Sequence, residues 1–261
     1  MLLEVINLKY GKFSNFNIKF LNNKQYAIVG NINSGNELLF KILSTLIMTE
    51  NVISFNDDVL TINNRFKYIR RIGVIRELSN YSFMTDNVYD ELSYSLLKLN
   101  LKEEEINQRI KLYLKFFNLR IKTKKIDELS IYEKQLLLVI TAIITEPQII
   151  LMEDIYSNLR LDDIKMVNKL LSCLVDNEEV TAIKFMNNFD YVNKNDYIYL
   201  MDDYEIVKEG HKDNLMEDDK FLTDHHLRVP FMYDLSNKLK MYKLIDKVYL
   251  DMEEMVNDIW K

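Results

Sequence analysis

The chain opens with alternating apolar and polar positions, which predict two half-buried strands. Residues 2–8 and 16–20 alternate in this way, a pattern typical of antiparallel strands with one face in the core. Gly11 lies between them and is expected in the turn. Residues 25–29 are more continuously apolar, as in a strand covered on both faces. Leucine and isoleucine then recur at helical spacing over 38–46, so a helix should follow this strand.

The rest of the chain repeats short apolar runs and helical stripes. The runs predict strands at 52–54, 59–62, 72–75, 149–152, 180–185, 197–201 and 205–208, and the stripes predict helices over 85–119, 130–144 and 161–174. Strands that alternate with helices indicate an α/β domain with a largely parallel sheet. The long helical run interrupts that alternation, so an inserted helical subdomain is expected over about 79–144. Residues 1–216 then form the main body, and the more polar residues 217–261 form a small helical extension.

Composition and charge argue against several classes of protein, including general nucleic-acid binders. The chain has 261 residues, of which 48% are apolar, enough for a sizeable core. A net charge of −6 argues against a general nucleic-acid binder. Its one cysteine, Cys173, excludes an intramolecular disulfide and fits a reducing compartment. The longest apolar run, 136–144, is far below the roughly 20 residues that span a bilayer. We therefore expect a cytoplasmic protein.

A loop framed by two glycines carries the main candidate chemistry. Gly30 and Gly35 lie between the third strand and the first helix, the scaffold of a phosphate-binding loop G-x-x-x-x-G-K-[ST]. Asn36 stands where that motif has lysine, and Glu37 where it has a magnesium-binding hydroxyl. The residues between the glycines that would face a nucleotide are Asn31, Asn33 and Ser34.

Further short motifs follow in a fixed order. They are Tyr10 in Leu-Lys-Tyr-Gly, Glu77 after the strand at 72–75, the run Leu129-Ser130-Ile131-Tyr132-Glu133, the acids Glu153 and Asp154 after a buried strand, and Asn187. In this order the chain resembles the ATP-binding subunits of ABC transporters over its whole length. It is most similar to the A subunits of energy-coupling factor (ECF) transporters.

The resemblance implies a P-loop NTPase cassette that uses ATP and Mg²⁺. It implies a role for each motif: Tyr10 stacks on adenine, Glu77 takes the place of the Gln-loop glutamine, Leu129 to Glu133 form the signature loop, Glu153 replaces the magnesium aspartate, Asp154 the catalytic glutamate and Asn187 the switch histidine. In this family each composite site uses the phosphate loop of one subunit and the signature loop of the other. Residues 227–239 and 246–261 resemble the C-terminal extension through which two A subunits dimerise.

The substitutions predict weak nucleotide chemistry. Asn36 offers a hydrogen bond but no charge, and Glu37 places a negative charge beside a polyanion. One unit charge pair at ~4 Å with an effective dielectric of ~20 is worth roughly 4 kcal/mol, so we expect ATP affinity to fall by several powers of ten. A magnesium ion bridging Glu37 and Glu153 would soften the repulsion.

The substitutions in the other motifs should also weaken nucleotide binding or hydrolysis. Asp154 is one methylene shorter than glutamate, and a displacement of about 1 Å in a catalytic group costs on the order of 10²-fold in rate. Asn187 cannot be protonated as a histidine can. Ile131 and Tyr132 replace signature glycines, so close approach of the backbone to a phosphate is lost.

Two functions remain open. In the first, the chain is an ATP-binding-cassette subunit of an ECF-type transporter for micronutrient or vitamin uptake, with weak or absent ATP binding and hydrolysis. It would pair with a second ATPase subunit as a homodimer or heterodimer. It would dock through residues 77–94 on a transmembrane coupling protein, and so meet a substrate-binding subunit at the inner face of the membrane. In the second, it is a catalytically dead scaffold or regulator outside transport.

Overall fold

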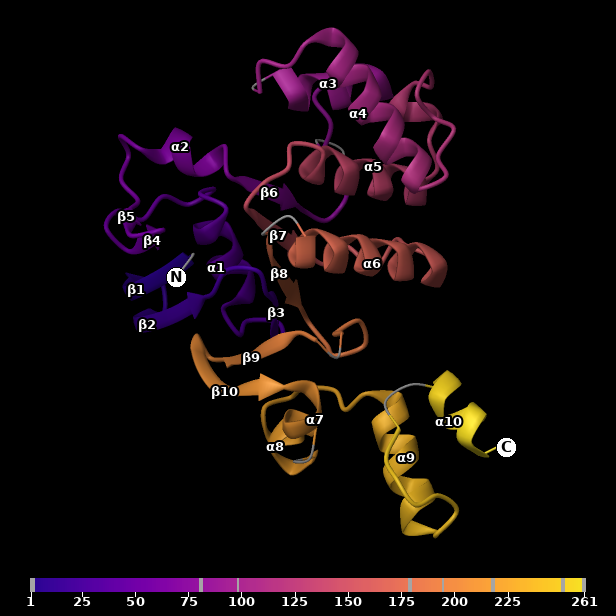
Figure 1. Ribbon diagram of the computed structural model, residues 1–261. Coiled ribbons are helices and arrows are strands. Elements are labelled where there is room, and N and C mark those ends of the chain that lie inside the picture. The colour runs from indigo at the N-terminus through magenta and orange to yellow at the C-terminus, as the bar shows by residue number, and fades with distance from the viewer. Residues whose placement is uncertain are drawn as a thin grey trace.

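Two sheets form the frame of the protein. A computed structural model describes residues 3–79, 82–97, 99–177, 180–193, 195–216, 219–249 and 252–259. A six-stranded sheet has the order β10-β9-β3-β8-β7-β6, and a four-stranded sheet has the order β2-β1-β4-β5. The helices cover the larger sheet and the smaller sheet stands to one side (Figure 1). The predicted α/β class is confirmed.

The larger sheet is parallel except at one edge. Its strands are β3 (Gln25–Gly30), β6 (Ile72–Ile75), β7 (Ile149–Glu153), β8 (Thr181–Met186), β9 (Tyr197–Asp202) and β10 (Glu205–His211). β3 pairs in parallel with β8 and β9, and β7 pairs in parallel with β6 and β8, whereas β10 returns antiparallel to β9. Every residue of β3 and β8 is buried, which the more continuously apolar run at 25–29 predicts for β3. The carboxyl ends of β3, β6, β7 and β8 therefore share one edge.

The smaller sheet is antiparallel and comes from the start of the chain. It contains β1 (Leu3–Tyr10), β2 (Phe13–Phe20), β4 (Ile53–Phe55) and β5 (Asp58–Val59). Gly11 turns β1 into β2 with φ 59°. β5 ends at Val59, short of the predicted strand at 59–62. Leu60 N–H still bonds to Ile53 O, but the N–H of Thr61 turns to the Asn64 side chain, Oδ1, at 2.8 Å.

Helices differ from the sequence expectation in three places. The described helices of the main body are α1 (Asn36–Leu43), α2 (Arg65–Ile69), α3 (Val88–Leu97), α4 (Glu103–Phe116), α5 (Ile131–Ile143) and α6 (Leu161–Asn177). α1 ends before Leu46 because Thr45 has a positive φ of 57°. The helical stretch expected over 85–119 is two helices, separated near Asn100, which has φ 55°. The short α2 has too few residues to leave a helical period in the sequence, and it was not predicted.

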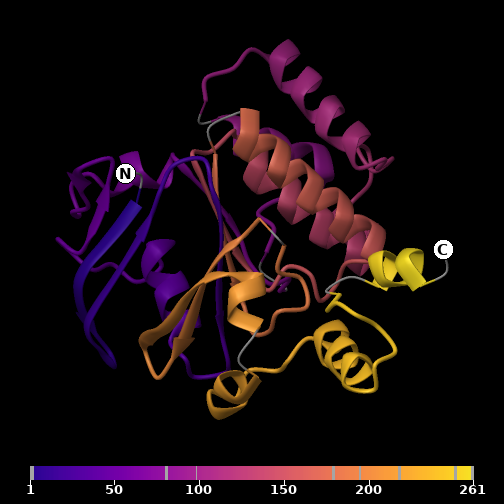
Figure 2. The ribbon, with the colours of Figure 1, turned by 60° about the horizontal axis from the view of Figure 1, so that its bottom comes forward.

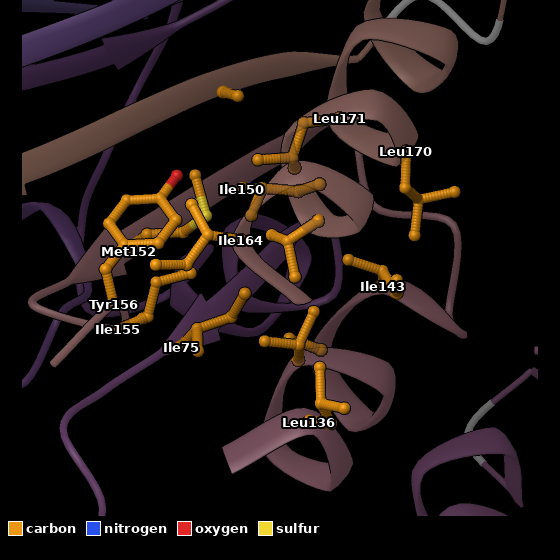
Figure 3. Close-up of a cluster of buried hydrophobic side chains, with 14 of the residues drawn as sticks. Ile75, Leu136, Ile143, Ile150, Met152, Ile155, Tyr156, Ile164, Leu170 and Leu171 are labelled. Carbon is orange, nitrogen blue, oxygen red and sulfur yellow. The ribbon is translucent and has the colours of Figure 1, made fainter. Parts of the chain in front are cut away.

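The helical subdomain shares the core of the larger sheet. Leu136 and Ile143 of α5 lie in one cluster with Ile75, Ile150 and residues of α6. Figure 3 shows these side chains filling the space between the helices and the strands. The position of α5 relative to β7 is therefore fixed by a continuous apolar core.

One buried ion pair ties the sheet to the loop before β9. Lys184 of β8 and Asp196 are both 0% exposed, with Nζ 2.7 Å from Oδ1 and 2.8 Å from Oδ2. Asp196 also accepts the N–H of Asn193 at 2.8 Å. Removing either residue would leave the charge of the other buried and unpaired, which would lower the stability of the fold.

The C-terminal region consists of α7 (Lys212–Met216), α8 (Asp219–Asp224), α9 (Phe231–Met241) and α10 (Met252–Ile259). Leu222, Leu227 and Tyr233 belong to the main core. A separate small cluster forms only farther on, around Ile245 and Tyr249. Lys165 near the start of α6 pairs with Glu253 of α10 at 3.3 Å, and Figure 2 shows α10, the yellow helix next to the C-terminus, near this end of the helices that cover the sheet. The expected boundary at 216/217 falls next to residues outside the described part.

No helix within the described ranges is long and apolar enough to cross a membrane.

Candidate functional site

A cleft of about 480 Å³ opens at the carboxyl edge of the larger sheet. It brings together most of the predicted site residues, which come from the loop after β3 and from the ends of β6, β7 and β8. The lining residues are Asn31, Ile32, Asn33, Gly35, Asn36, Glu37, Leu38, Lys41, Ile47, Glu77, Glu153, Asp154, Phe185, Met186, Asn187 and Tyr204. Gly30, Ser34 and Tyr10 were also predicted and do not line it.

The two glycines are required by close packing. A Cβ on Gly30 would lie 2.4 Å from Ser34 Oγ and 2.6 Å from Met201 O. Gly35 has φ 104°, and a Cβ there would meet the Tyr204 ring at 2.9 Å. The loop is closed further by the N–H of Ser34, which donates to Asn31 O at 3.1 Å. The backbone scaffold of a phosphate-binding loop is thus present.

Asn36 is turned into the protein. Its Nδ2 donates to Ile28 O at 3.3 Å and to Met186 O at 3.2 Å, and the residue is 6% exposed. These bonds join the first residue of α1 to the ends of β3 and β8. The Asn36 side chain therefore bonds to the sheet, although it stands at the position where the motif has a phosphate-binding lysine.

Glu37 occupies the first turn of α1 and forms an ion pair with Lys41. A helix N-terminus attracts anions, but here a carboxylate of the chain itself already stands at it. Among the described residues, Lys41 is the one lysine that lines the cleft, and its ammonium is engaged by Glu37. The arrangement reduces the attraction of this helix start for phosphate.

Four carboxylates surround the cleft, those of Glu37, Glu77, Glu153 and Asp154. Burial raises the pKa of Glu153 above its ordinary value; the Arg76 guanidinium opposes the shift and the Glu37 charge adds to it. Within the ranges described, no group of three or more His, Cys, Asp or Glu is placed to hold a metal ion. The residues present therefore do not fit ATP-Mg²⁺ well, because the charges that would face the polyanion are mainly negative.

Asp154 and Asn187, to which the resemblance assigns the places of the catalytic glutamate and the switch histidine, are both exposed and line the cleft. Asp154 has a left-handed backbone with φ 41°, and its N–H bonds to Phe185 O at 3.3 Å. This bond holds the acid at the junction of β7 and β8. The short carboxylate is thus held close to the sheet.

Two aromatic residues line the cleft, Phe185 of β8 and Tyr204, and Tyr204 was not predicted as a site residue. Its N–H donates to Ser34 O at 2.8 Å, and its ring packs edge-on against Phe13 with centroids 5.1 Å apart. Tyr10 is 43% exposed and pairs with Phe13 across the β1–β2 hairpin. The Asp203-Tyr204 pair, with φ of 41° and 67°, marks a tight β9–β10 turn, but no spacing in the sequence connects that turn to the distant glycine loop.

The predicted signature residues form the N-terminus of α5. Ser130 caps the helix, its Oγ accepting the N–H of Glu133 at 3.4 Å. Glu133 Oε2 in turn accepts from Ser130 N at 2.9 Å and Oγ at 2.8 Å, and Lys124 Nζ lies 3.3 Å from Oε1. Burial alone would raise the pKa of Glu133, but the Ser130 hydrogen bonds and the Lys124 charge lower it. A second helix start is therefore also occupied by a carboxylate of the chain.

The two residues that replace signature glycines lie differently. Ile131 is 62% exposed at the tip of the loop, whereas Leu129 is buried beneath it. The Tyr132 ring lies under the guanidinium of Arg160, 4.3 Å from the ring centroid. Tyr132 thus packs within its own chain.

The C-terminal region reaches the glycine loop through His225. Its carbonyl accepts Asn31 Nδ2 at 3.4 Å, and its Nδ1 lies 2.7 Å from Asp202 Oδ2 at the end of β9. The segment after α8 therefore contacts the cleft edge.

Comparison with known proteins agrees with this geometry. The chain is 22% identical over 270 residues to "Energy-coupling factor transporter ATP-binding protein EcfA1" of Oenococcus oeni, covering 100% of this chain and 98% of that protein. It is 26% identical over 249 residues to the protein of the same description from Mesomycoplasma hyopneumoniae, with 95% and 90% covered. The resemblance to ECF ATPase subunits is confirmed by these relatives.

Solved structures share the fold. The cbiO1 structure from Clostridium perfringens, described as part of the ABC transporter complex cbiONQ, has a TM-score of 0.72 at 19% identity, covering 85% of this chain and 93% of that one. A dimeric structure of the ATP-binding cassette MJ0796 bound to ADP and Pi has a TM-score of 0.69 at 18% identity, covering 80% and 98%. The family model described as ABC transporter matches residues 13–156. Since that match spans more than half of the sequence, the chain belongs to the ABC transporter family.

Proposed function

We propose that this chain is an ATP-binding-cassette subunit of an ECF-type transporter for micronutrient or vitamin uptake, and that it binds and hydrolyses ATP weakly or not at all. It acts at the inner face of the cell membrane, in a complex with a second ATPase subunit and a transmembrane coupling protein. Through that coupling protein it serves a separate membrane subunit that binds the substrate. The relatives named as ECF ATP-binding proteins support the transport assignment.

The observation that carries the second half of the proposal is the inward turn of Asn36. A side chain bonded to Ile28 O and Met186 O does not reach out to a phosphate. Glu37 and Glu133 add carboxylates at both helix starts that face nucleotide in this family. Asn36 and Glu37 alter the phosphate loop, and Glu133 alters the signature loop. A partner subunit with an unaltered sequence would therefore restore neither composite site.

A groove suits the coupling protein. It has a volume of about 350 Å³ and lies between the larger sheet and the helical subdomain, lined by Leu46, Arg65, Val74, Ser82, Leu138 and Thr141, among others. Ser82 belongs to the segment 77–94 expected to dock. A mixed apolar and polar groove of this kind accepts a short helix of a membrane protein.

A separate surface suits the second ATPase subunit. On α10, Met252, Val256 and Ile259 are 51%, 42% and 48% exposed and recur at i, i+4 and i+7. Nothing in the described part of the chain covers this stripe. An amphipathic helix with an open apolar stripe supports the role of residues 217–261 as a dimerisation extension.

Affinity purification of the tagged chain from the membranes of its host tests the proposal. We expect recovery of a second ATPase subunit and a membrane coupling protein. Thr141→Arg in the groove should lose the coupling protein, and Val256→Lys on α10 should lose the ATPase subunit. Leu112→Lys, at a 66% exposed leucine on α4, is the matched control and should lose neither.

Recovery of neither partner would contradict the transport proposal. It would favour the alternative function, a catalytically dead ABC scaffold or regulator outside transport. Both occupied helix starts are compatible with that alternative, so the purification decides between the two.

A further inference from the structure

A basic stretch of the chain connects the smaller sheet to the larger one. Residues 59–76 contain four arginines and one lysine and no aspartate or glutamate, although the whole chain carries a net charge of −6. This stretch includes the end of β5 and all of α2 and β6. Figure 1 shows α2 and β5 at one side of the molecule, away from the C-terminal helices. Positive charge is therefore concentrated on one part of an otherwise acidic protein.

Lys67 and Arg71 line a small pocket of about 80 Å³ between α2 and the β4–β5 hairpin. The Arg71 guanidinium lies over the Phe55 ring, 5.2 Å from its centroid, so this cation has a fixed position. Asp58 is the one acid among the described residues that line the pocket. The two cations therefore outnumber it, and the pocket retains a positive charge.

The short helix α2 presents two different sides. Tyr68 is 4% exposed and its hydroxyl donates to a carbonyl of α1, which fixes the inner side of α2. Arg65 and Ile69 line the groove already proposed for the coupling protein. Phe66 and Arg70 are both exposed and lie four residues apart, so they share the outer side. The outer side thus combines an aromatic ring with a cation.

Three apolar side chains in this region are exposed to solvent. Phe66 is 75% exposed, Ile62 57% and Val59 46%. Lys67 and Arg70 beside them are also exposed, and neither forms an ion pair with another residue that the structure describes. We call these five residues the α2 face.

We propose that the α2 face binds a membrane surface that carries anionic lipids. Lys67 and Arg70 lie beside the lipid phosphates, and Phe66 and Ile62 enter the layer between the headgroups. Basic side chains are attracted to the negative potential of an anionic leaflet, and exposed apolar side chains gain from burial at the boundary of its acyl chains. The charge of the α2 face is complementary to such a surface.

This inference rests on the proposed function, which places the chain at the inner face of the membrane, and it adds a lipid contact that needs no partner protein. The groove wall formed by Arg65 and Ile69 belongs to the same helix as the α2 face. A coupling protein in the groove and lipid at the α2 face would therefore meet the cassette on neighbouring surfaces. The three exposed apolar side chains favour a lipid surface over nucleic acid, which would be held mainly through its phosphates.

Flotation of the purified full chain with lipid vesicles tests the inference. Vesicles of phosphatidylcholine alone are compared with vesicles that contain about 30% phosphatidylglycerol. We expect at least about tenfold stronger partitioning onto the anionic vesicles, because the neutral ones offer no charge attraction. A rise in salt from about 0.1 M to about 1 M should weaken this binding.

Two variants separate the two contributions. Arg70→Glu should lower partitioning onto anionic vesicles by at least about tenfold, since it reverses one charge at the surface. Phe66→Ser should lower it by at least about fivefold through loss of apolar burial, and this loss should persist at high salt. Lys169→Glu on α6 and Phe231→Ser on α9 make the same changes at exposed positions elsewhere, and both should leave partitioning unchanged.

Equal binding to neutral and anionic vesicles, absence of binding to both, or binding that is indifferent to Arg70→Glu and Phe66→Ser would overturn the inference. Tighter binding to duplex RNA than to anionic vesicles would also overturn it. Recovery of both partners in the membrane purification without vesicle binding would refute this inference and leave the transport proposal standing. Vesicle binding without recovery of either partner would do the reverse.

Discussion

Replacing Asn36 by lysine and Glu37 by serine is expected to create ATP-Mg²⁺ affinity in this chain. In the unchanged protein, Asn36 is 6% exposed and its amide bonds to two strand carbonyls. Glu37 is 73% exposed in its side chain and pairs with Lys41. The double variant restores the lysine and the hydroxyl of the phosphate-binding motif on a loop whose backbone is already formed.

The two substitutions contribute different amounts to the free energy of ATP binding. Removing Glu37 abolishes a repulsion of about 1 kcal/mol, since this exposed carboxylate interacts in nearly water-like dielectric at ~4 Å. Adding a lysine beside β- and γ-phosphates contributes up to roughly 4 kcal/mol at an effective dielectric of ~20. The two contributions together reach about 5 kcal/mol, so at 1.4 kcal/mol per tenfold we expect ATP affinity to rise by up to about four-thousandfold.

Isothermal calorimetry with ATP-Mg²⁺ measures this directly, and each single variant separates the two contributions. Glu104→Ser with Gln108→Lys on α4 makes the same charge change at exposed positions far from the loop and serves as the control. Loss of the two Asn36 hydrogen bonds should lower the free energy of unfolding by about 1–2 kcal/mol, so thermal melting must confirm that the variant is folded. An affinity equal to that of the control variant would refute the electrostatic reasoning.

Three further predictions concern stability. Lys184→Met should lower the free energy of unfolding by about 3–5 kcal/mol because it leaves Asp196 charged and buried, and the further change Asp196→Asn should recover part of the loss in urea titrations. Glu133→Gln should lower stability at pH 7 by about 1 kcal/mol; because the native pKa is lowered, this difference should vanish as pH falls below that pKa, which pH-dependent denaturation measures. Gln135→Leu should raise stability by about 1–3 kcal/mol, since Gln135 is fully buried and its amide has no hydrogen-bond partner among the described residues, and an unchanged or lower melting temperature would contradict this.

The strands and their order along the chain were predictable because burial on one or two faces leaves a period in the sequence. β3 and β8 are buried along their whole length and consist mainly of apolar residues, and both glycines of the loop meet a steric demand that only glycine satisfies. The missing positive charge at Asn36 and the added negative charge at Glu37 could be predicted from residue type and spacing alone.

The sequence could not show which way a side chain turns. Asn36 was expected to offer its amide to phosphate, but two strand carbonyls bind that amide instead. Tyr204 reaches the cleft only because the β9–β10 turn folds back onto Ser34, a contact between segments 170 residues apart. Arg160 over Tyr132 likewise joins two loops that local pattern cannot connect.

Calorimetric titration of the unchanged full chain with ATP-Mg²⁺ asks whether the cleft binds nucleotide. With an inward Asn36 and a carboxylate at the first turn of α1, we expect no binding heat at micromolar concentrations, consistent with a dissociation constant of about a millimolar or weaker. A dissociation constant of about a micromolar or tighter would contradict it.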